Sequence, residues 1–344
     1  MSLHLVTGGS GFVGSYIVQN LLARGEQVRV LDLWKADDLP KDVDFVYGDI
    51  RDETVVARAM QGVDYVHHNV ALVPLSKAAE RYEQVIVGGT RIALEQAQKA
   101  GVKFFAFMSS SAIFGVPDTM PIPPDAPHNP IEIYGRAKAR ADALVQQAIK
   151  DGFPACCIRP RTVIGRNRLG IFAILFEWIR DNAHIYVIGS GNVLFQFLHA
   201  EDLAEVSVLA ALKQKTGLYN VGAPRYGTLR EDLEALIKEV GSRSKVKSLP
   251  VLPAMWLLEL LDVLKLSPLS PWHYKTYHKA FYFDSSHVTE ALDWHPRFGN
   301  REMMIEAYNW FVSSDRKEKE SGRSPHRSLI KQGALGLLKA VSRF

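Results

Sequence analysis

The first 165 residues alternate short, almost continuously apolar runs with longer segments in which apolar residues recur every three or four positions. Runs of the first kind are typical of strands buried on both faces, and segments of the second kind are typical of the helices that cover them. The pattern predicts strands at Leu3–Thr7, Val28–Asp32, Phe45–Tyr47, Tyr65–His68, Phe104–Ser109 and Ala155–Arg159. It predicts helices at Val13–Ala23, Thr54–Met60, Ala79–Ala100 and Ile133–Ile149. Repeated strand–helix–strand units indicate an α/β fold with a doubly wound parallel sheet.

The rhythm of strands and helices breaks near residue 165. We therefore expect residues 1–165 to form the core that contains the sheet, with later segments returning to it, and residues 166–312 to form mainly a smaller substrate-binding lobe. Residues 313–327 are polar and charged, which is typical of a linker. Residues 328–344 form a separate tail.

The composition narrows the class of protein. The chain has 344 residues, of which 47% are hydrophobic, 23% are charged and only two are cysteine. These values exclude a disordered chain, a collagen-like repeat and a small disulfide-stabilised protein. Cys156 and Cys157 are adjacent in an apolar run, so we expect buried thiols in a reducing compartment. The sequence contains no apolar run of about 18 residues and starts with no signal-peptide pattern, which favours a cytoplasmic protein.

The formal net charge of +4 belongs to the end of the chain. Of the 41 Lys and Arg residues, eight lie in residues 315–344, and of the 37 Asp and Glu residues, three lie there. The remaining 33 basic and 34 acidic residues leave the body nearly neutral, which argues against a nucleic-acid partner. In residues 328–344 the apolar side chains recur at helical spacing opposite Lys331, Lys339 and Arg343. This pattern predicts a cationic amphipathic helix that lies on a membrane surface, or one that docks on the body or on a partner.

A glycine-rich turn follows the first strand and opens the first helix. Gly8, Gly11 and Gly14 have the spacing that allows a tight turn, close approach of a pyrophosphate and close packing of helix on sheet. The helix N-terminus supplies amide donors for phosphates. The turn predicts a dinucleotide site of Rossmann type, made by Gly8, Ser10, Gly11, Phe12, Val13 and Gly14. The alternative is a purely structural turn.

Two acidic residues at later strand ends extend this predicted cofactor site. Asp32 ends the second strand, where a carboxylate accepts hydrogen bonds from the adenosine ribose and repels a 2′-phosphate, so NAD is favoured over NADP. Asp49 and Ile50 follow the third strand. We expect Asp49 to form a hydrogen bond with the amino group of the adenine and Ile50 to pack on its ring. The alternative at that place is a plain turn in which Asp52 caps the next helix.

Tyr134 and Lys138 lie four residues apart and therefore on one face of the predicted helix. An ammonium group near a phenol favours the phenolate, so Tyr134 is a candidate general acid and base. The serine run Ser109–Ser111 ends an apolar strand, where a hydroxyl would orient a substrate oxygen. The competing interpretation of Tyr134 and Lys138 is an exposed pair on a helix surface.

With these motifs, and with Ile158–Pro160 and Phe197–Ala204, the chain resembles the extended short-chain dehydrogenase/reductase family over about residues 1–312. This family includes NAD-dependent epimerases and dehydratases and a 3β-hydroxysteroid dehydrogenase-like branch. The resemblance implies hydride transfer to or from nicotinamide with Tyr134 as acid/base, and it selects Ser110 as the catalytic serine, with Ser111 second. It also implies that further residues border the cofactor, namely Asn69, Ala71, Ser109, Tyr134, Lys138, Pro160 and Val163.

Several positions depart from the family pattern. Ile86 stands where an asparagine that supports the active site is frequent, which puts a proton relay there in doubt. Thr162 replaces an asparagine typical of nucleotide-sugar enzymes, and Phe195 replaces an arginine that would pair with a diphosphate. Arg161, Arg166 and Arg168 offer alternative cations. We therefore expect Ser111, Thr162 and Phe195 to face a substrate other than a UDP- or dTDP-sugar.

The second lobe contains an unusually apolar helix near residues 250–265, which resembles lid helices of the 3β-hydroxysteroid dehydrogenase-like branch. Met255, Trp256, Leu258 and Leu261 are expected either to line an apolar substrate entrance or to form the core of this lobe. His67, His68 and His199 fit strand ends and sheet packing better than a metal site, so we expect no metal.

Three functional hypotheses follow. The first is an NAD-dependent oxidoreductase that acts on a secondary alcohol or ketone of an apolar, sterol- or isoprenoid-like substrate, peripheral on a membrane. The second is a sugar-nucleotide epimerase or dehydratase that holds NAD tightly. The third is a non-catalytic, NAD-bound regulatory protein. The family resemblance also implies a homodimer formed through residues 79–100 and 131–150.

Overall fold

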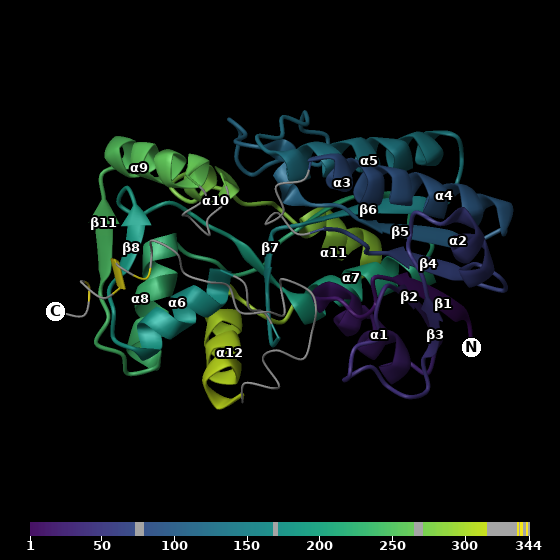
Figure 1. The fold of residues 1–344 in the computed structure, drawn as a ribbon, viewed down its shortest axis with the longest axis horizontal. Helices are drawn as coiled ribbons and strands as arrows, with labels where there is room; N and C mark the ends of the chain where they lie inside the picture. Colours follow the sequence, from purple (N-terminus) through teal and green to yellow (C-terminus); the bar gives the residue numbers. More distant parts are fainter. Residues whose placement is uncertain are drawn as a thin grey trace.

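The computed structural model describes residues 1–72, 79–167, 171–264 and 271–314, together with residues 336, 338, 339 and 342. Its centre is a seven-stranded, entirely parallel sheet with the strand order β10-β6-β5-β4-β1-β2-β3 (Figure 1). The strands are β1 (Leu3–Thr7), β2 (Gln27–Asp32), β3 (Asp44–Tyr47), β4 (Tyr65–His68), β5 (Phe104–Met108), β6 (Ala155–Pro160) and β10 (Gly217–Val221). This order is that of a doubly wound dinucleotide-binding sheet. The predicted fold class is therefore confirmed.

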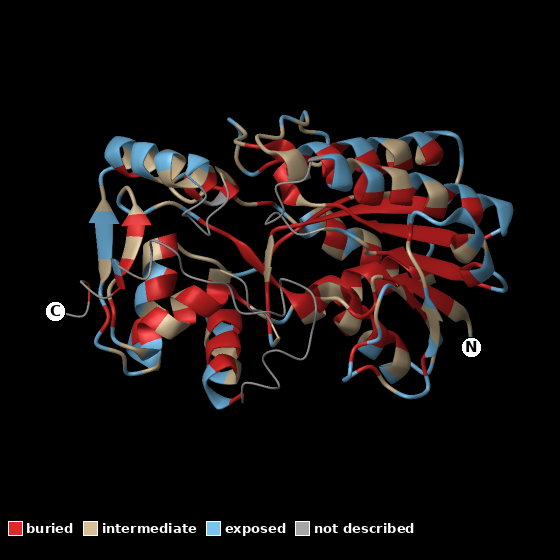
Figure 2. Ribbon diagram, in the orientation of Figure 1, coloured by how far each residue is buried: buried red, intermediate tan, exposed pale blue. Residues whose placement is uncertain are grey.

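Helices cover both faces of the sheet because its central strands are apolar on both sides. One face carries α1 (Phe12–Ala23), α7 (Ala200–Leu212) and α11 (Ser286–Leu292). The other carries α2 (Glu53–Ala59), α3 (Ala79–Tyr82), α4 (Gly89–Lys99) and α5 (Ile133–Lys150). Figure 2 shows the strands of this sheet as mostly buried between the two helical layers. Cys156 and Cys157 lie in β6 as buried free thiols, as expected.

The predicted helix over Ala79–Ala100 is interrupted in the structure. A π-helical segment, η1 (Glu83–Gly88), separates α3 from α4. Such segments are rare and occur often near functional sites. The periodicity of the sequence could not reveal this insertion, because it shifts the buried face by only one position.

A smaller lobe with its own apolar core lies beside the carboxyl ends of the strands. Its helices are α6 (Ile171–Arg180), α8 (Leu229–Glu239), α9 (Val251–Val263), α10 (Pro271–Thr276) and α12 (Asn300–Ser313), and a 3₁₀ turn, η2 (Ser111–Phe114), packs against it. Two short parallel sheets pair β8 (Ile185–Ile188) with β11 (Val246–Leu249) and β7 (Thr162–Ile164) with β9 (Phe197–His199). Both small sheets and β10 were absent from the sequence-based prediction.

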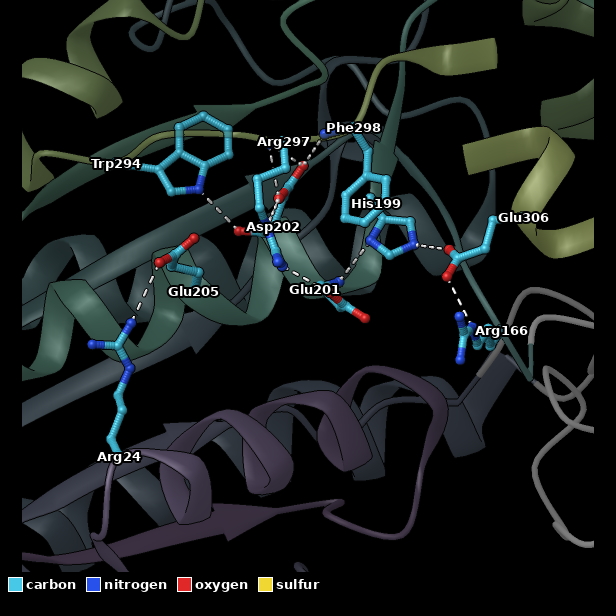
Figure 3. A network of polar contacts seen from close by, with 10 residues as sticks. All are labelled: Arg24, Arg166, His199, Glu201, Asp202, Glu205, Trp294, Arg297, Phe298 and Glu306. Atoms are coloured by element: carbon cyan, nitrogen blue, oxygen red, sulfur yellow. Dashed lines mark hydrogen bonds and ion pairs between the residues drawn. The ribbon is translucent and has the colours of Figure 1, made fainter. Parts of the chain in front are cut away.

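A network of polar contacts joins the smaller lobe to α7 (Figure 3). His199 precedes α7, and its ring bonds Glu306 of α12 through Nε2 at 2.7 Å. Glu306 also pairs with Arg166 at 2.8 Å. The fully buried carboxylate of Asp202 accepts the backbone N–H groups of residues 297 and 298. The start of α7 is thus fixed to α12 and to the residues just before it.

The surface of α9 carries large apolar side chains that no described residue covers. Its exposed members are Leu252, Trp256, Leu257, Leu260, Val263 and Leu264, with exposed fractions from 55% to 77%. We call this set the α9 apolar face. Figure 2 shows α9 as mostly exposed. In the described part of the chain, every helix is too short or too polar to cross a bilayer.

Little of the C-terminal region belongs to the described residues. The predicted linker lies outside them beyond Ser314, and so does most of the predicted tail. Within the tail, Lys339 is 9% exposed at its side chain and pairs with Glu177 at 2.6 Å and with Asp181 at 2.8 Å. These contacts are those of the alternative in which the tail docks on the body.

Candidate active site

A cleft of about 700 Å³ lies at the carboxyl ends of the parallel strands, between the sheet and the smaller lobe. This is the edge at which open α/β sheets bind ligands. Most of the residues selected from the sequence line it: Gly8, Gly11, Phe12, Val13, Asp32, Asp49, Ile50, Asn69, Ala71, Ser109, Ser110, Ser111, Tyr134, Lys138, Pro160, Thr162 and Val163. Residues that are distant in the sequence are brought together here because the turns after the parallel strands meet at one edge of the sheet, where α5 adds Tyr134 and Lys138.

Three of the selected residues do not line the cleft. Ser10 is fully buried, and its Oγ accepts a hydrogen bond from the backbone N–H of Ala36 at 3.3 Å. Gly14 lies in the first turn of α1, where it packs against the backbone of Gly8 and Gly9. Phe195 is fully buried, with the guanidinium of Arg161 4.9 Å from its ring centre. Phe195 therefore faces an arginine and has no direct exposure to the cleft.

The glycine turn has the geometry of a phosphate cradle. Gly8 has a positive φ of 71°, and a Cβ on Gly14 would collide with the carbonyl oxygen of Gly8. The turn therefore requires glycine at both positions. Gly11 precedes α1 and has no side chain to cap it, so the first N–H groups of the helix point towards the cleft without a side-chain acceptor.

Asp32 is held by the same turn. Its Oδ2 accepts the N–H of Ser10 at 3.1 Å, and its Oδ1 accepts the N–H of Leu33 at 2.7 Å. Burial raises the pKa of this carboxyl group, while these backbone donors act in the opposite direction. The two bonds fix the carboxylate at the end of β2, where a ribose would lie.

The turn after β3 caps a helix and also borders the cleft. Asp52 caps α2 by accepting the N–H groups of Thr54 and Val55 at 3.0 and 3.2 Å. Asp49 nevertheless lines the cleft, and its carboxylate pairs with Arg51 at 2.6 Å. The hydrogen bond from Arg51 lowers the pKa of Asp49, so this group is an acceptor at neutral pH.

The helix that carries Tyr134 and Lys138 begins at a carboxylate. Glu132 accepts the N–H groups of Tyr134 and Gly135 at 3.1 and 2.9 Å. Lys138 is 2% exposed, and its Nζ donates to the carbonyl oxygen of Met108 at 2.6 Å. Burial lowers the pKa of Lys138 to about 7. Tyr134 is half-buried and lines the cleft, which differs from the exposed pair of the competing interpretation.

The three serines of the run Ser109–Ser111 have different partners. The hydroxyl of Ser109 donates to Asp142 at 2.5 Å, so it is used inside the protein. Ser110 Oγ accepts the N–H of Ala112 at 3.2 Å, and Ser111 Oγ accepts Nη1 of Arg161 at 3.2 Å. The side chains available to a substrate are therefore those of Ser110 and Ser111.

A buried ion pair that the sequence did not reveal supports this arrangement. Asp142 of α5 and Arg159 of β6 form a two-point contact, with Nε to Oδ2 at 2.9 Å and Nη2 to Oδ1 at 2.7 Å. Burial opposes the charge of Asp142, but the bonds from Arg159 and Ser109 outweigh it and lower the pKa. The pair fixes α5 against the strand next to the serine run.

The sequence also singled out Ile86, His67 and His68, which are buried and contact only the protein interior. Ile86 is fully buried in the apolar core, as its side chain requires. His67 bonds His4 and Ser207, and His68 bonds Thr7 and Thr90. Among the described residues, no group of three or more His, Cys, Asp or Glu side chains is arranged to hold a metal ion.

The smaller lobe lines one part of the cleft, which we call the substrate end. Ile171, Phe172, Trp272 and Tyr277 line it, together with Arg161. Met255, Trp256, Leu258 and Leu261 of α9 do not line this cleft, and Trp256 is 74% exposed. The aromatic residues near α10 carried no recognisable motif, so the sequence did not select them.

Comparisons with known proteins show the family of the chain. The sequence profile of the NAD dependent epimerase/dehydratase family matches residues 4–222. Uncharacterized protein y4nG of Sinorhizobium fredii is 39% identical over 340 residues, which is 98% of this chain and 86% of that protein. The sterol-4-alpha-carboxylate 3-dehydrogenase, decarboxylating, of Mus musculus is 32% identical over 211 residues, which is 60% of this chain and 58% of that enzyme.

Among solved structures, the UDP-glucose 4-epimerase of Thermus thermophilus in complex with NAD is similar, with a TM-score of 0.73 and 25% identity. The match covers 91% of this chain and 100% of the epimerase. Relatives named for sterol substrates and relatives named for sugar nucleotides thus lie at comparable distances.

Proposed function

The chain belongs to the NAD-dependent epimerase/dehydratase family of extended short-chain dehydrogenases, and from this premise we propose that it oxidises or reduces an apolar substrate. The reaction is hydride transfer between nicotinamide and a secondary alcohol or ketone of a sterol- or isoprenoid-like molecule. Membership of an enzyme family, with Tyr134 and Lys138 in the cleft, leaves no support for a non-catalytic regulatory protein.

The observation that carries the proposal is the lining of the substrate end. Ile171, Phe172, Trp272 and Tyr277 present aliphatic and aromatic surface to the cleft. An apolar ligand gains free energy when it covers such surface, whereas a diphosphate requires several charged donors in its place. Thr162 also lines the cleft at the position where nucleotide-sugar enzymes carry an asparagine.

The residues of the cleft fit NAD. The glycine turn and the first N–H groups of α1 would hold the pyrophosphate, and Asp32 would hold the adenosine ribose. Asp49 and Ile50 are placed to hold the adenine. When bound, the nicotinamide supplies the group that accepts or donates the hydride. A carboxylate at Asp32 disfavours the 2′-phosphate of NADP, so we propose NAD as the cofactor.

The proton chemistry is assigned to the chain's own residues. Tyr134 would take the proton of the substrate hydroxyl during oxidation and return it during reduction. The ammonium group of Lys138, buried beside the same helix face, would favour the phenolate of Tyr134 and bind the nicotinamide ribose. The hydroxyl group of Ser110, which lines the cleft, would form a hydrogen bond with the substrate oxygen. Apolar walls would exclude water from this reaction.

The direct test is NAD-dependent oxidation of secondary alcohols, followed by absorbance of NADH. We expect turnover of a 3β-hydroxysterol or an isoprenoid secondary alcohol, delivered in cyclodextrin, and loss of that turnover in Tyr134→Phe. UDP-glucose serves as the opposing substrate. Turnover of UDP-sugars together with inactivity towards every apolar alcohol would overturn the proposal.

A sugar-nucleotide epimerase is the second candidate, because the chain shares its fold with UDP-glucose 4-epimerase and because Arg51, Arg81 and Arg161 line the cleft. This function requires NAD to stay bound through purification without net reduction. It also requires an arginine that grips a diphosphate. Mass spectrometry of ligands that co-purify with the protein distinguishes the two candidates.

We also propose that the enzyme works at an anionic membrane surface, since apolar substrates concentrate there. The α9 apolar face supports this part of the proposal more strongly than the tail does. It presents aliphatic residues and Trp256 to solvent, whereas Lys339 of the tail is paired with two carboxylates of the body. Exposed apolar helix faces of this kind insert into the interface of a bilayer.

A further inference from the structure

Two buried arginines stand two residues apart at the end of β6 and have opposite electrostatic surroundings. Arg159 and Arg161 are each 1% exposed. Arg159 is paired with Asp142 at 2.7 Å. Arg161 makes no ion pair with any carboxylate of the described residues. A buried cation without a counter-charge is costly and calls for an explanation.

The contacts of Arg161 hold its position but leave its charge uncompensated. Its Nε donates to the carbonyl oxygen of Gln196 at 3.1 Å, and its Nη1 donates to Ser111 Oγ at 3.2 Å. The rings of Phe281 and Phe195 lie 3.9 and 4.9 Å from the guanidinium carbon. Burial lowers the pKa of Arg161 to about 9, so the group remains cationic at neutral pH.

One end of this guanidinium lacks a partner. Nη2 of Arg161 is buried and finds no hydrogen-bond acceptor among the described residues. Arg161 and Ser111 both line the substrate end of the cleft. Because Ser111 Oγ accepts a bond from Nη1, its own O–H remains a donor. The chain therefore holds two neighbouring donors beside the cleft, one of them charged, and no described residue supplies an anion to them.

We propose that Nη2 of Arg161 and the hydroxyl of Ser111 bind a carboxylate of the substrate. Two adjacent donors match the two oxygens of one carboxylate, whereas a diphosphate would need more donors than this buried corner offers. The inference rests on the proposed function and narrows it: the substrate is an apolar molecule that carries both a secondary hydroxyl group and an acid.

The adjacency of Ser110 and Ser111 limits the distance between the carboxylate and the reacting hydroxyl group of the substrate. Ser111 is adjacent to Ser110, which is assigned to the reacting oxygen, and both face the cleft with Tyr134. The carboxylate and the hydroxyl must therefore lie within a few bonds of each other, as in a 3-hydroxy acid. The carboxylate acts as a handle that orients the carbon to be oxidised, and it takes no part in the proton transfer.

The first experiment uses the ligand-free protein and compares Arg161→Met with Arg159→Met. Arg159→Met leaves Asp142 buried and unpaired, so it should lower the melting temperature by several degrees. Arg161→Met removes an uncompensated charge. This variant should lower the melting temperature by less than half of the decrease seen in Arg159→Met. A loss in Arg161→Met equal to that in Arg159→Met would show that Arg161 is only a structural brace and would overturn the proposal.

The second experiment measures affinity for a matched pair of probes, 3-hydroxydecanoate and its methyl ester, by calorimetry on the NAD-loaded protein. Wild type should bind the acid at least about tenfold more tightly than the ester. Arg161→Met should abolish this preference, and Arg161→Lys should retain part of it. Arg140→Met, which alters an exposed arginine of α5, is the control that keeps the preference.

Each remaining outcome counts against the inference. Equal affinity for acid and ester, or no binding of the acid to wild type, overturns it. If UDP binds and its binding depends on Arg161, the guanidinium binds a phosphate. This result would overturn both the proposed carboxylate site and the proposed apolar substrate. Turnover of neutral apolar alcohols by wild type, with no acid preference, leaves the proposed function standing while this inference fails.

Discussion

The Cα atom of Gly135 lies against the carbonyl oxygen of Ala112, so close that a methyl group on it would come within 2.7 Å of that oxygen. Gly135 follows Tyr134 at the start of α5, and Ala112 belongs to the turn η2 that follows Ser110. The contact sets the distance between the helix that carries Tyr134, the proposed acid/base, and the turn that follows Ser110.

Gly135→Ala should therefore separate these elements by a fraction of an ångström and lower kcat by about 10- to 100-fold. The fold should persist, because the helix itself tolerates alanine. Steady-state rates and melting temperature measure the two effects. Gly88→Ala is the control, since a methyl group there meets no atom closer than 3.8 Å. Equal rates in the two variants would contradict this reading of the contact.

Removing the phenol of Tyr134 should stop catalysis without loss of cofactor binding. Tyr134→Phe keeps the ring and its edge contact with Tyr82 at 6.4 Å. We expect kcat to fall by about 10²- to 10⁴-fold, the usual contribution of a general acid or base, while the dissociation constant of NAD changes little. Tyr186→Phe, outside the cleft, should keep full activity. An active Tyr134→Phe enzyme would exclude the assigned role.

Asp32 should determine the choice between the two nicotinamide cofactors. Asp32→Ala removes the ribose acceptor and the charge that repels a 2′-phosphate, so the ratio of NADP affinity to NAD affinity should rise by about tenfold or more. Fluorescence titration with both cofactors measures this ratio. Asp37→Ala alters an exposed carboxylate beyond the same strand and should leave it unchanged. A ratio that is the same in both variants would remove Asp32 from the cofactor site.

Buried neutral histidines should make the protein sensitive to mild acid. Burial lowers the pKa of His4 to about 4 and that of His68 to about 3. Unfolded histidines bind a proton near pH 6.5, so between pH 6.5 and pH 4 the unfolded chain binds more protons than the folded one. The free energy of unfolding should therefore fall as the pH falls, by about 1–2 kcal/mol per histidine at pH 5.

His68→Gln keeps a polar side chain near Thr7 and Thr90 but has no proton to bind. Denaturant unfolding at pH 7.5 and pH 5 should show a smaller loss of stability in this variant than in wild type. An identical loss in both proteins would mean that other groups cause the acid sensitivity.

Membrane binding should depend on the α9 apolar face. The double variant Trp256→Ser, Leu260→Ser should reduce co-sedimentation with anionic phosphatidylserine vesicles several-fold, because both side chains are more than half exposed. A chain ending at Arg327 should lose less binding, and most of that loss should disappear at high salt. Full binding by the α9 variant would reject this surface, and loss confined to the shortened chain would assign the role to the tail.

The sequence was most informative where structure depends on local pattern. The six predicted strands lie within one residue of the observed bounds at each end, because each is a short apolar run between turn residues. The glycine turn and the shared helix face of Tyr134 and Lys138 could also be predicted, because both depend only on the spacing of nearby residues. The seventh strand, β10, has a polar Asn220 in its apolar run and lies far from the others in the chain, so its place in the sheet was not predicted.

What the sequence could not supply are relationships between distant residues. Arg159 and Arg161 have the same chemistry and nearly the same position in the chain. Only the fold gives one of them Asp142 and surrounds the other with rings from residues 195 and 281. Similarly, Phe195 was expected to face substrate, but it lies two residues before β9 and is buried against Arg161. Lys339 was assigned to a cationic face, and its two acidic partners come from α6 and the residue after it.

The network around His199 and Asp202 separates two tasks within one molecule. It anchors the start of α7 to α12 and to the residues just before α12, whereas Phe172 and Trp272, which line the cleft, belong to α6 and α10. The side chains of this polar network come from neither α6 nor α10. Substitutions at Phe172 and Trp272 can therefore change the shape of the cleft and leave these polar contacts as they are. The architecture separates the polar attachment of α7 from the side chains that shape the cleft.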